Sequence, residues 1–140
     1  MSLPTVPKRP LTVTLTLWGV FLLGVWNAVR AIAWARQSSI LLALGATPDP
    51  RLQLAVAVVW TLVFLGLAVA LWRNRPFVRR AVPVFLTLYA VYRLSLPLFF
   101  TQVPLNCQGW FVRLLIYLAA IMYAQWALNR AGAKSSFRRL

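Results

Sequence analysis

Residues 52–72 read LQLAVAVVWTLVFLGLAVALW and contain no charged side chain. A helix needs about 20 apolar residues to cross the hydrocarbon of a bilayer, at a rise of about 1.5 Å per residue. The stretch does not alternate with period two, as a strand of a membrane barrel would. It therefore predicts a membrane-spanning helix, and the number of similar stretches around it decides the fold.

Three further apolar stretches are long enough to cross a bilayer, and each contains a single arginine. They cover residues 11–34, 81–100 and 110–128. Residues 45–50, which read GATPDP, combine glycine with two prolines and so break the chain after the first stretch. We predict an all-α polytopic membrane protein, a four-transmembrane-helix bundle over residues 11–128. The segment 1–10 and the basic tail 129–140 are expected to lie outside the membrane.

The segment Ala35–Leu44 is apolar but too short to cross a bilayer by itself. It is expected either to extend the first helix or to lie in the membrane interface. The N-terminus also has features of a cleaved signal peptide, with Lys8 and Arg9 before an apolar run and a small-x-small site at residues 31–33. A spanning helix is the preferred interpretation, because the apolar run is long enough to span and Arg30 directly precedes that site.

The charge balance of the chain is strongly basic, with 15 Lys and Arg residues against a single acid, Asp49. Nucleic-acid binders are often this basic, but the chain is 61% hydrophobic and its basic residues stand between apolar runs, which is typical of membrane proteins. Histidine is absent and Cys107 is the only cysteine, so a metal site lacks ligands and Ser-His-Asp or two-carboxylate catalysis is excluded. We expect no cofactor, no nucleic-acid partner and no enzymatic activity.

Ten of the 15 basic residues fall on one predicted side of the membrane. They are Lys8, Arg9, Arg73, Arg75, Arg79, Arg80, Arg130, Lys134, Arg138 and Arg139. Because Lys and Arg near helix ends favour the cytoplasmic side, both termini are predicted to be cytoplasmic in a bacterial inner membrane. We name Arg73, Arg75, Arg79 and Arg80 the basic collar, and expect it to contact anionic headgroups of the lipid bilayer. Docking of an acidic partner on the collar is the alternative.

Arg30, Arg93 and Arg113 are predicted to lie towards the outer side, where helix direction makes them unequal. Helical side chains lean towards the N-terminus, so Arg113, on a helix that starts outside, leans out to water. Arg30 is close enough to the end of its span to reach water as well. Arg93 leans towards the bilayer centre from a position roughly 18 Å above the inner end of its helix. It is therefore the arginine that most needs partners within the membrane.

An intramembrane arginine without an acid nearby suggests a binding site. We hypothesise an outward-facing pocket that holds an anion, a lipid phosphate or an acidic group of a partner subunit. Its candidate residues are Arg93, Arg30, Arg113, Asn27 and Tyr89. Tyr89, one turn below Arg93, is expected to make a cation–π contact with it, and Pro97 leaves the carbonyl of residue 93 free to accept a hydrogen bond. The alternative is an arginine satisfied by these groups and by water alone.

Two sequence features bear on how the helices pack. Helices in lipid associate through small residues, and the candidate seams are Gly24, Ala28, Ala31, Ala35, Gly66, Ala70, Ala120, Ala124 and Ala127. The segment LTLWGV at residues 15–20 also resembles LTLYAV at residues 86–91. Two interpretations are open: two duplicated helical hairpins in parallel orientation, or an apolar sequence with chance matches.

The segment Leu71–Arg80, LWRNRPFVRR, resembles one in small uncharacterised bacterial membrane proteins of four helices. In those proteins a basic R-x-R-P-aromatic-x-R stretch joins the second and third helices. The resemblance covers about ten residues closely and the four-span arrangement loosely. It implies the same fold, but no activity and no functional residue.

Two functional hypotheses follow. The leading one is a non-enzymatic accessory or scaffold subunit, whose apolar surface meets a larger membrane complex or a second copy of the chain. The alternative is a small transporter or channel that binds an anion or a lipid headgroup through the arginine pocket. Proton-coupled cation export is disfavoured, because no predicted span contains an acid.

Overall fold

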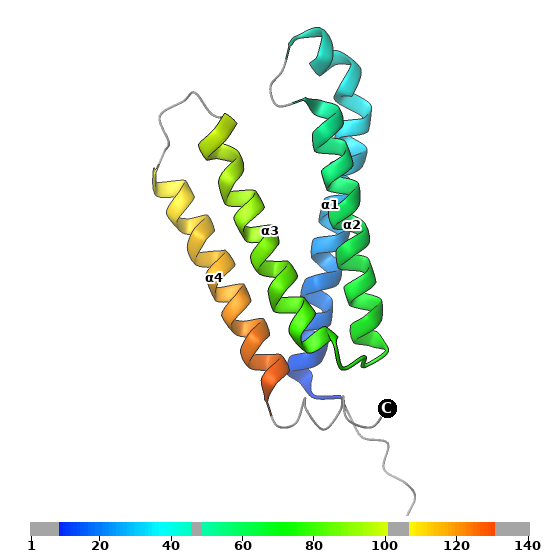
Figure 1. Cartoon of the computed structure of the whole chain (residues 1–140), viewed down its shortest axis with the longest axis vertical. Coiled ribbons are helices and arrows are strands. Elements are labelled where there is room, and N and C mark those ends of the chain that lie inside the picture. The colour runs from blue at the N-terminus through cyan, green and yellow to red at the C-terminus, as the bar shows by residue number, and fades with distance from the viewer. Residues whose placement is uncertain (1–8, 46–48, 101–106, 131–140) are drawn as a thin grey trace, which may run out of the picture.

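The computed structural model describes residues 9–45, 49–100 and 107–130 (Figure 1). These residues form four helices and contain no strand. The helices are α1 (Leu11–Ala43), α2 (Pro50–Trp72), α3 (Val78–Phe100) and α4 (Cys107–Asn129). All four contain a stretch long and apolar enough to cross a membrane. The prediction of an all-α four-helix bundle is confirmed, and the chain is a multi-pass membrane protein.

The first helix continues well beyond the predicted span. It ends at Ala43, so the segment after Trp34 is an extension of α1, one of the two expected arrangements. At 33 residues it is about 50 Å long, against about 30 Å for the hydrocarbon of a bilayer. One end of α1 must therefore project beyond the hydrocarbon, or the helix must be tilted.

The second helix, α2, begins directly after Asp49, the only acidic residue of the chain. The Asp49 side chain accepts a hydrogen bond of 2.9 Å from the Arg51 backbone N–H, and Pro50 occupies the first helical position. A carboxylate satisfies the free N–H groups of a helix N-terminus and opposes its positive dipole end, while proline has no N–H to lose. Asp49 therefore has a structural role as the cap of α2.

The connection between α2 and α3 is a tight turn. Asn74 adopts a left-handed conformation with φ 52°, which asparagine tolerates better than most residues. The N–H groups of Arg75 and Asn74 donate to the carbonyls of Ala70 and Leu71, in the pattern of a Schellman motif. Because α2 ends this sharply, α3 already begins at Val78, three residues before the predicted start of its span.

The four helices are arranged as two hairpins, α1 with α2 and α3 with α4, and each hairpin is more closely packed internally than against the other. The hairpins meet at one end of the bundle and diverge towards the other (Figure 1). We name the first the basic end, because the α2–α3 connection with its arginines lies there, together with the start of α1 and the end of α4. The other is the opposite end. Duplication of the hairpins stays a prediction.

The hydrophobic core fills the basic half of the bundle. Phe64, Leu71, Val78, Val82 and Leu128 are fully buried, and they come from α2, α3 and α4. Buried residues of α1 complete the cluster. The buried residues described in α4 all belong to its last two turns, and those of α3 end at Ala90. The two hairpins are therefore fixed to each other mainly at the basic end.

The closest helix contact at a glycine is made by Gly24 of α1. A Cβ atom on Gly24 would lie 2.9 Å from the Leu65 Cδ2 and 3.4 Å from the Leu65 backbone nitrogen, so α2 can approach only because the side chain is absent. Ala31, Ala124 and Ala127 are also buried at predicted seams. Gly66, Ala35 and Ala120 were expected at seams too, but all three are exposed, and no atom lies within 4 Å of the position of a Cβ on Gly66. Those expectations are wrong.

Candidate functional site

Arg93 lies on α3, where the two hairpins have begun to diverge. It is 15 residues beyond Val78, which places it about 22 Å along the helix from the basic end. This is further than the sequence indicated, because α3 starts three residues earlier than the predicted span. Arg93 is half-buried, as is every residue of α3 from Tyr92 to Pro97. The guanidinium is thus neither in the core nor on the outer surface.

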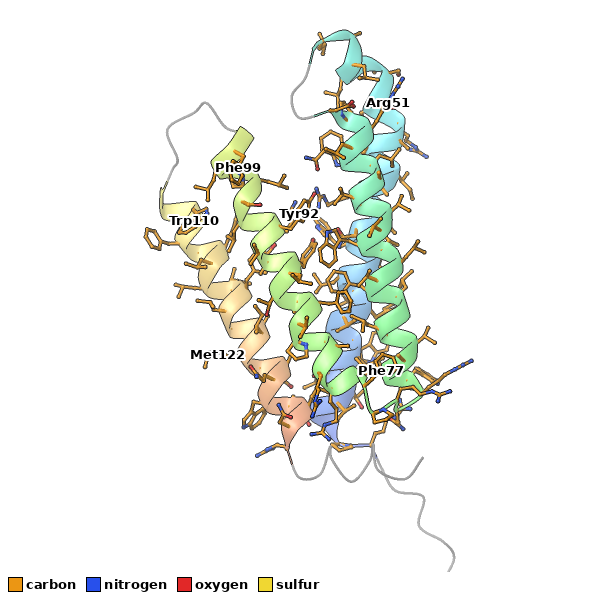
Figure 2. The ribbon with its side chains drawn as sticks, viewed as in Figure 1. Arg51, Phe77, Tyr92, Phe99, Trp110 and Met122 are labelled. Carbon is orange, nitrogen blue, oxygen red and sulfur yellow. The ribbon has the colours of Figure 1, made fainter. Side chains whose placement is uncertain are left out.

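The Tyr92 hydroxyl is the point where polar groups of three helices converge. It lies 3.4 Å from the Gln53 Oε1 of α2, to which it donates. The Arg30 side chain of α1 lies near the same hydroxyl, and the Arg93 charge acts on it electrostatically. Figure 2 shows Tyr92 on the side of α3 that faces the α1–α2 hairpin. We name Arg30 and Arg93 the arginine pair.

A layer of aromatic and amide side chains lies next to the arginine pair, one helical turn nearer the basic end. Asn27 of α1 is fully buried. Its Nδ2 donates a hydrogen bond of 2.9 Å to the Leu23 carbonyl and lies 3.3 Å from the Tyr89 hydroxyl. The Tyr89 ring is surrounded by aromatic neighbours, with centroid distances of 5.0 Å to Trp60, 5.1 Å to Phe64 and 6.2 Å to Tyr117. We name these four rings, with Tyr92, the aromatic layer. It forms the part of the core and its border that lies next to the arginine pair.

The arginine pair has no carboxylate side chain to neutralise it. Asp49, the only acid of the chain, caps α2 through the Arg51 N–H. Two like charges that act on the same hydroxyl repel each other, by an amount that falls as the distance between them grows. The groups available to Arg30 are neutral acceptors such as the Tyr92 hydroxyl. This arrangement favours a bound anion, which would convert the repulsion between two guanidiniums into two attractive contacts.

The structure brings together four of the five predicted site residues, in two adjacent groups. Arg30 and Arg93 both act electrostatically on Tyr92, and Asn27 and Tyr89 are hydrogen-bonded to each other. Arg113 is exposed on α4, a helix that contributes nothing to the contacts of Tyr92 among the described residues. The structure therefore does not place it with the pair.

The expected cation–π contact between Arg93 and Tyr89 is not among the contacts of the described residues. The Tyr89 ring is occupied by its aromatic neighbours, and its hydroxyl by Asn27. The two cation–π contacts found in the described part of the chain lie at the basic end, where Arg9 is 5.6 Å from the Trp72 ring and Arg130 is 4.2 Å from the Trp126 ring.

Sequence reasoning missed Gln53, Tyr92 and Trp60 as parts of the site. Gln53 carried a usable signal in the sequence, because it is a lone amide near the start of a span without charges. In the structure it is only 8% exposed. An amide that avoids lipid is expected to face another helix. Tyr92 and Trp60 carried no such signal, since aromatic residues also face lipid.

The basic collar is not uniform. The Arg79 Nε donates to the Leu128 carbonyl at 3.2 Å, and its Nη2 donates to the Asn129 Oδ1 at 3.4 Å, so Arg79 links α3 to the end of α4. Arg73, Arg75 and Arg80 are exposed. A cation at a helix C-terminus is stabilising, because it satisfies carbonyls that have no partner within the helix.

No cluster of three or more His, Cys, Asp or Glu side chains occurs in residues 9–45, 49–100 and 107–130. Comparison of the chain with protein-family models, with curated proteins and with solved structures found no match. Function is therefore inferred from the chemistry of the side chains and their surroundings.

Proposed function

We propose that this chain is a non-enzymatic protein of the inner (plasma) membrane, and that its arginine pair holds an anionic group in the outer half of the bilayer. One observation carries the proposal: the charges of Arg30 and Arg93, on different helices, both act on the Tyr92 hydroxyl, in a chain whose only acid caps α2. Charge within a membrane is costly and needs a partner. An oxyanion is suited to this role, because the planar guanidinium matches carboxylate and phosphate oxygens in pairs.

Binding is favoured over conduction by what lies between the arginine pair and the basic end. The aromatic layer and the core occupy this path, and Tyr89, Phe64 and Leu71 are at most 2% exposed. We therefore propose that the anion reaches the pair from the opposite end, because the core fills the basic half of the bundle. A route through the bundle would require these buried side chains to move. The proposal is therefore a site with one entrance.

Inorganic phosphate is expected to stabilise the protein in a saturable way. With the chain in neutral detergent and zwitterionic lipid, the unfolding midpoint should rise with phosphate and level off, because binding to the native state adds about 1.4 kcal/mol at ten times Kd. Circular dichroism during heating measures the midpoint. Sodium chloride at equal ionic strength is the control, and Arg113→Gln should respond as the parent does. A rise that follows ionic strength alone would contradict the proposal.

Both termini are proposed to be cytoplasmic. The four helices alternate in direction, so the start of α1, the α2–α3 connection and the end of α4 share the basic end (Figure 1). The arginines described there are Arg9, Arg73, Arg75, Arg79, Arg80 and Arg130. Since Lys and Arg near helix ends favour the cytoplasmic side, this distribution supports a cytoplasmic basic end. The arginine pair is then in the outer half of the membrane.

The orientation can be tested with a maleimide that does not cross membranes. Cys107, the only cysteine, begins α4 at the opposite end and is expected to react in intact spheroplasts. A Phe77→Cys, Cys107→Ser variant places the thiol in the α2–α3 connection, at an exposed position, and should react only after permeabilisation. The reverse pattern of labelling would show that the basic end faces outwards.

An accessory subunit is the second candidate, and the exposure of α4 favours it. Of the described residues of α4, Ala124, Ala127 and Leu128 are buried, whereas Phe111, Leu115, Ile116 and Met122 are more than half exposed. Lipid can cover this apolar face, and so can another subunit. A partner that brings a carboxylate to the arginine pair would combine both candidates. Such a complex should survive mild detergent and dissociate when Arg93 is replaced.

A further inference from the structure

A groove of about 530 Å³ lies between α3 and α4 near the basic end, and neither arginine of the pair lines it. Arg79, Arg80 and Asn129 line it at the basic end. Val84, Leu88 and Ile121 line its other part. The groove is thus polar and positively charged at one end and apolar at the other.

The spacing of the lining residues explains the shape of the groove. Arg80, Val84 and Leu88 follow each other at intervals of four residues and so form one stripe along α3. Ile121, Gln125 and Asn129 form the equivalent stripe on α4. From Arg80 to Leu88 the stripe extends about 12 Å along the helix axis. This length matches the upper part of a phospholipid acyl chain below its headgroup.

The two arginines of the groove differ in what they already bind. Arg79 is occupied by the Leu128 carbonyl and by Asn129, and so it neutralises the C-terminal end of α4. Arg80 is exposed, and its side chain takes part in none of the hydrogen bonds or ring contacts of the described residues. No acid is near, because Asp49 caps α2 at the opposite end. Arg80 therefore presents an uncompensated charge at the mouth of an apolar groove.

We propose that this groove is a binding site for one anionic phospholipid. The phosphate binds to Arg80, and one acyl chain lies on Val84, Leu88 and Ile121. The charge of Arg80 selects an anionic headgroup, and the apolar stripe selects a lipid over a soluble phosphate. The site does not depend on the arginine pair, because neither Arg30 nor Arg93 lines the groove.

Lipid retention in native mass spectrometry tests the proposal. The full chain is released from micelles that contain equal amounts of dioleoyl phosphatidylglycerol and dioleoyl phosphatidylcholine. The parent should retain phosphatidylglycerol preferentially, and Arg80→Gln should lower this preference about five-fold, as removal of one charge at an anionic headgroup predicts. Arg75→Gln removes an exposed collar arginine that does not line the groove, and it should change the preference less than about two-fold.

A second pair of variants tests the groove without a change of charge. Val84→Trp fills the apolar part and should displace the retained phosphatidylglycerol. Val91→Trp, at an equally exposed valine of α3 outside the groove, should not. Because both valines are exposed, both variants are expected to fold, and circular dichroism verifies this. Equal effects of Arg80→Gln and Arg75→Gln, or undiminished retention in folded Val84→Trp, would overturn the proposal in favour of diffuse attraction to the basic end.

Discussion

Replacing Gly24 with leucine is expected to separate α1 from α2. A Cβ atom at this position would already lie 2.9 Å from the Leu65 Cδ2, and the remaining atoms of leucine would have no space between the helices. Overpacking of a close contact costs about 1–3 kcal/mol, and in lipid no hydrophobic term between the helices offsets the lost packing. The free energy of unfolding should fall by this amount in a titration with sodium dodecyl sulfate followed by circular dichroism.

Two other glycines provide matched controls for this prediction. Gly19 on α1 and Gly66 on α2 are helical as well, and no atom lies within 4 Å of a Cβ at either position. Leucine at these positions should leave the free energy of unfolding unchanged or raise it slightly, because leucine favours helix more than glycine does. Gly24→Ala should cost less than Gly24→Leu, since a single added carbon requires only the Leu65 side chain to shift. Equal losses at all three glycines would show that the contact at Gly24 does not matter.

Replacing Arg93 with glutamine is expected to have opposite effects with and without an anion. Without phosphate, the substitution removes the repulsion between Arg93 and Arg30. The free energy of unfolding should therefore rise by about 1 kcal/mol, as expected for two separated like charges at an effective dielectric constant of about 20. At saturating phosphate it removes a charge-assisted contact, which contributes about 1.5–3 kcal/mol, and should therefore be destabilising. Urea titration in neutral micelles measures both values.

The reversal distinguishes the anion site from a purely structural arginine. An Arg93 satisfied by carbonyls and water would lose stability on substitution under both conditions. Arg113→Gln, at an exposed position of α4, should change the free energy of unfolding by the same amount with and without phosphate. Arg93→Lys keeps the charge but loses the paired donors of the guanidinium, so it should keep the repulsion and bind phosphate more weakly than the parent.

The number of helices could be predicted from the sequence, because it follows from the length of the apolar stretches and the scarcity of charged residues within them. The end of α1 could also have been found: residues 35–43 contain no glycine or proline, and Gly45, at φ 65°, is the first residue that interrupts the helix. The start of α3 was harder. It depends on the Asn74 turn, which brings Arg79 and Arg80 into the first turn of a helix rather than into a loop.

The site could be predicted only in part, because in a membrane both the interior and the exterior of a bundle are apolar. Helix direction identified Arg93 as the arginine that needs a partner, and this required no knowledge of packing. Its convergence with Arg30 depends on the rotation of α1 and α3 about their axes. Apolar periodicity does not fix that rotation when the surroundings are lipid. The same reason accounts for the wrong expectation at Gly66.

The coupling energy between positions 30 and 93 tests most directly whether the arginine pair holds an anion. It is obtained from the unfolding free energies of the parent, Arg30→Gln, Arg93→Gln and the double variant, measured in neutral micelles with and without phosphate. We predict an unfavourable coupling without phosphate that becomes favourable, by about 1 kcal/mol or more, at saturating phosphate. A coupling near zero under both conditions, or one that phosphate does not change, would contradict the proposed site.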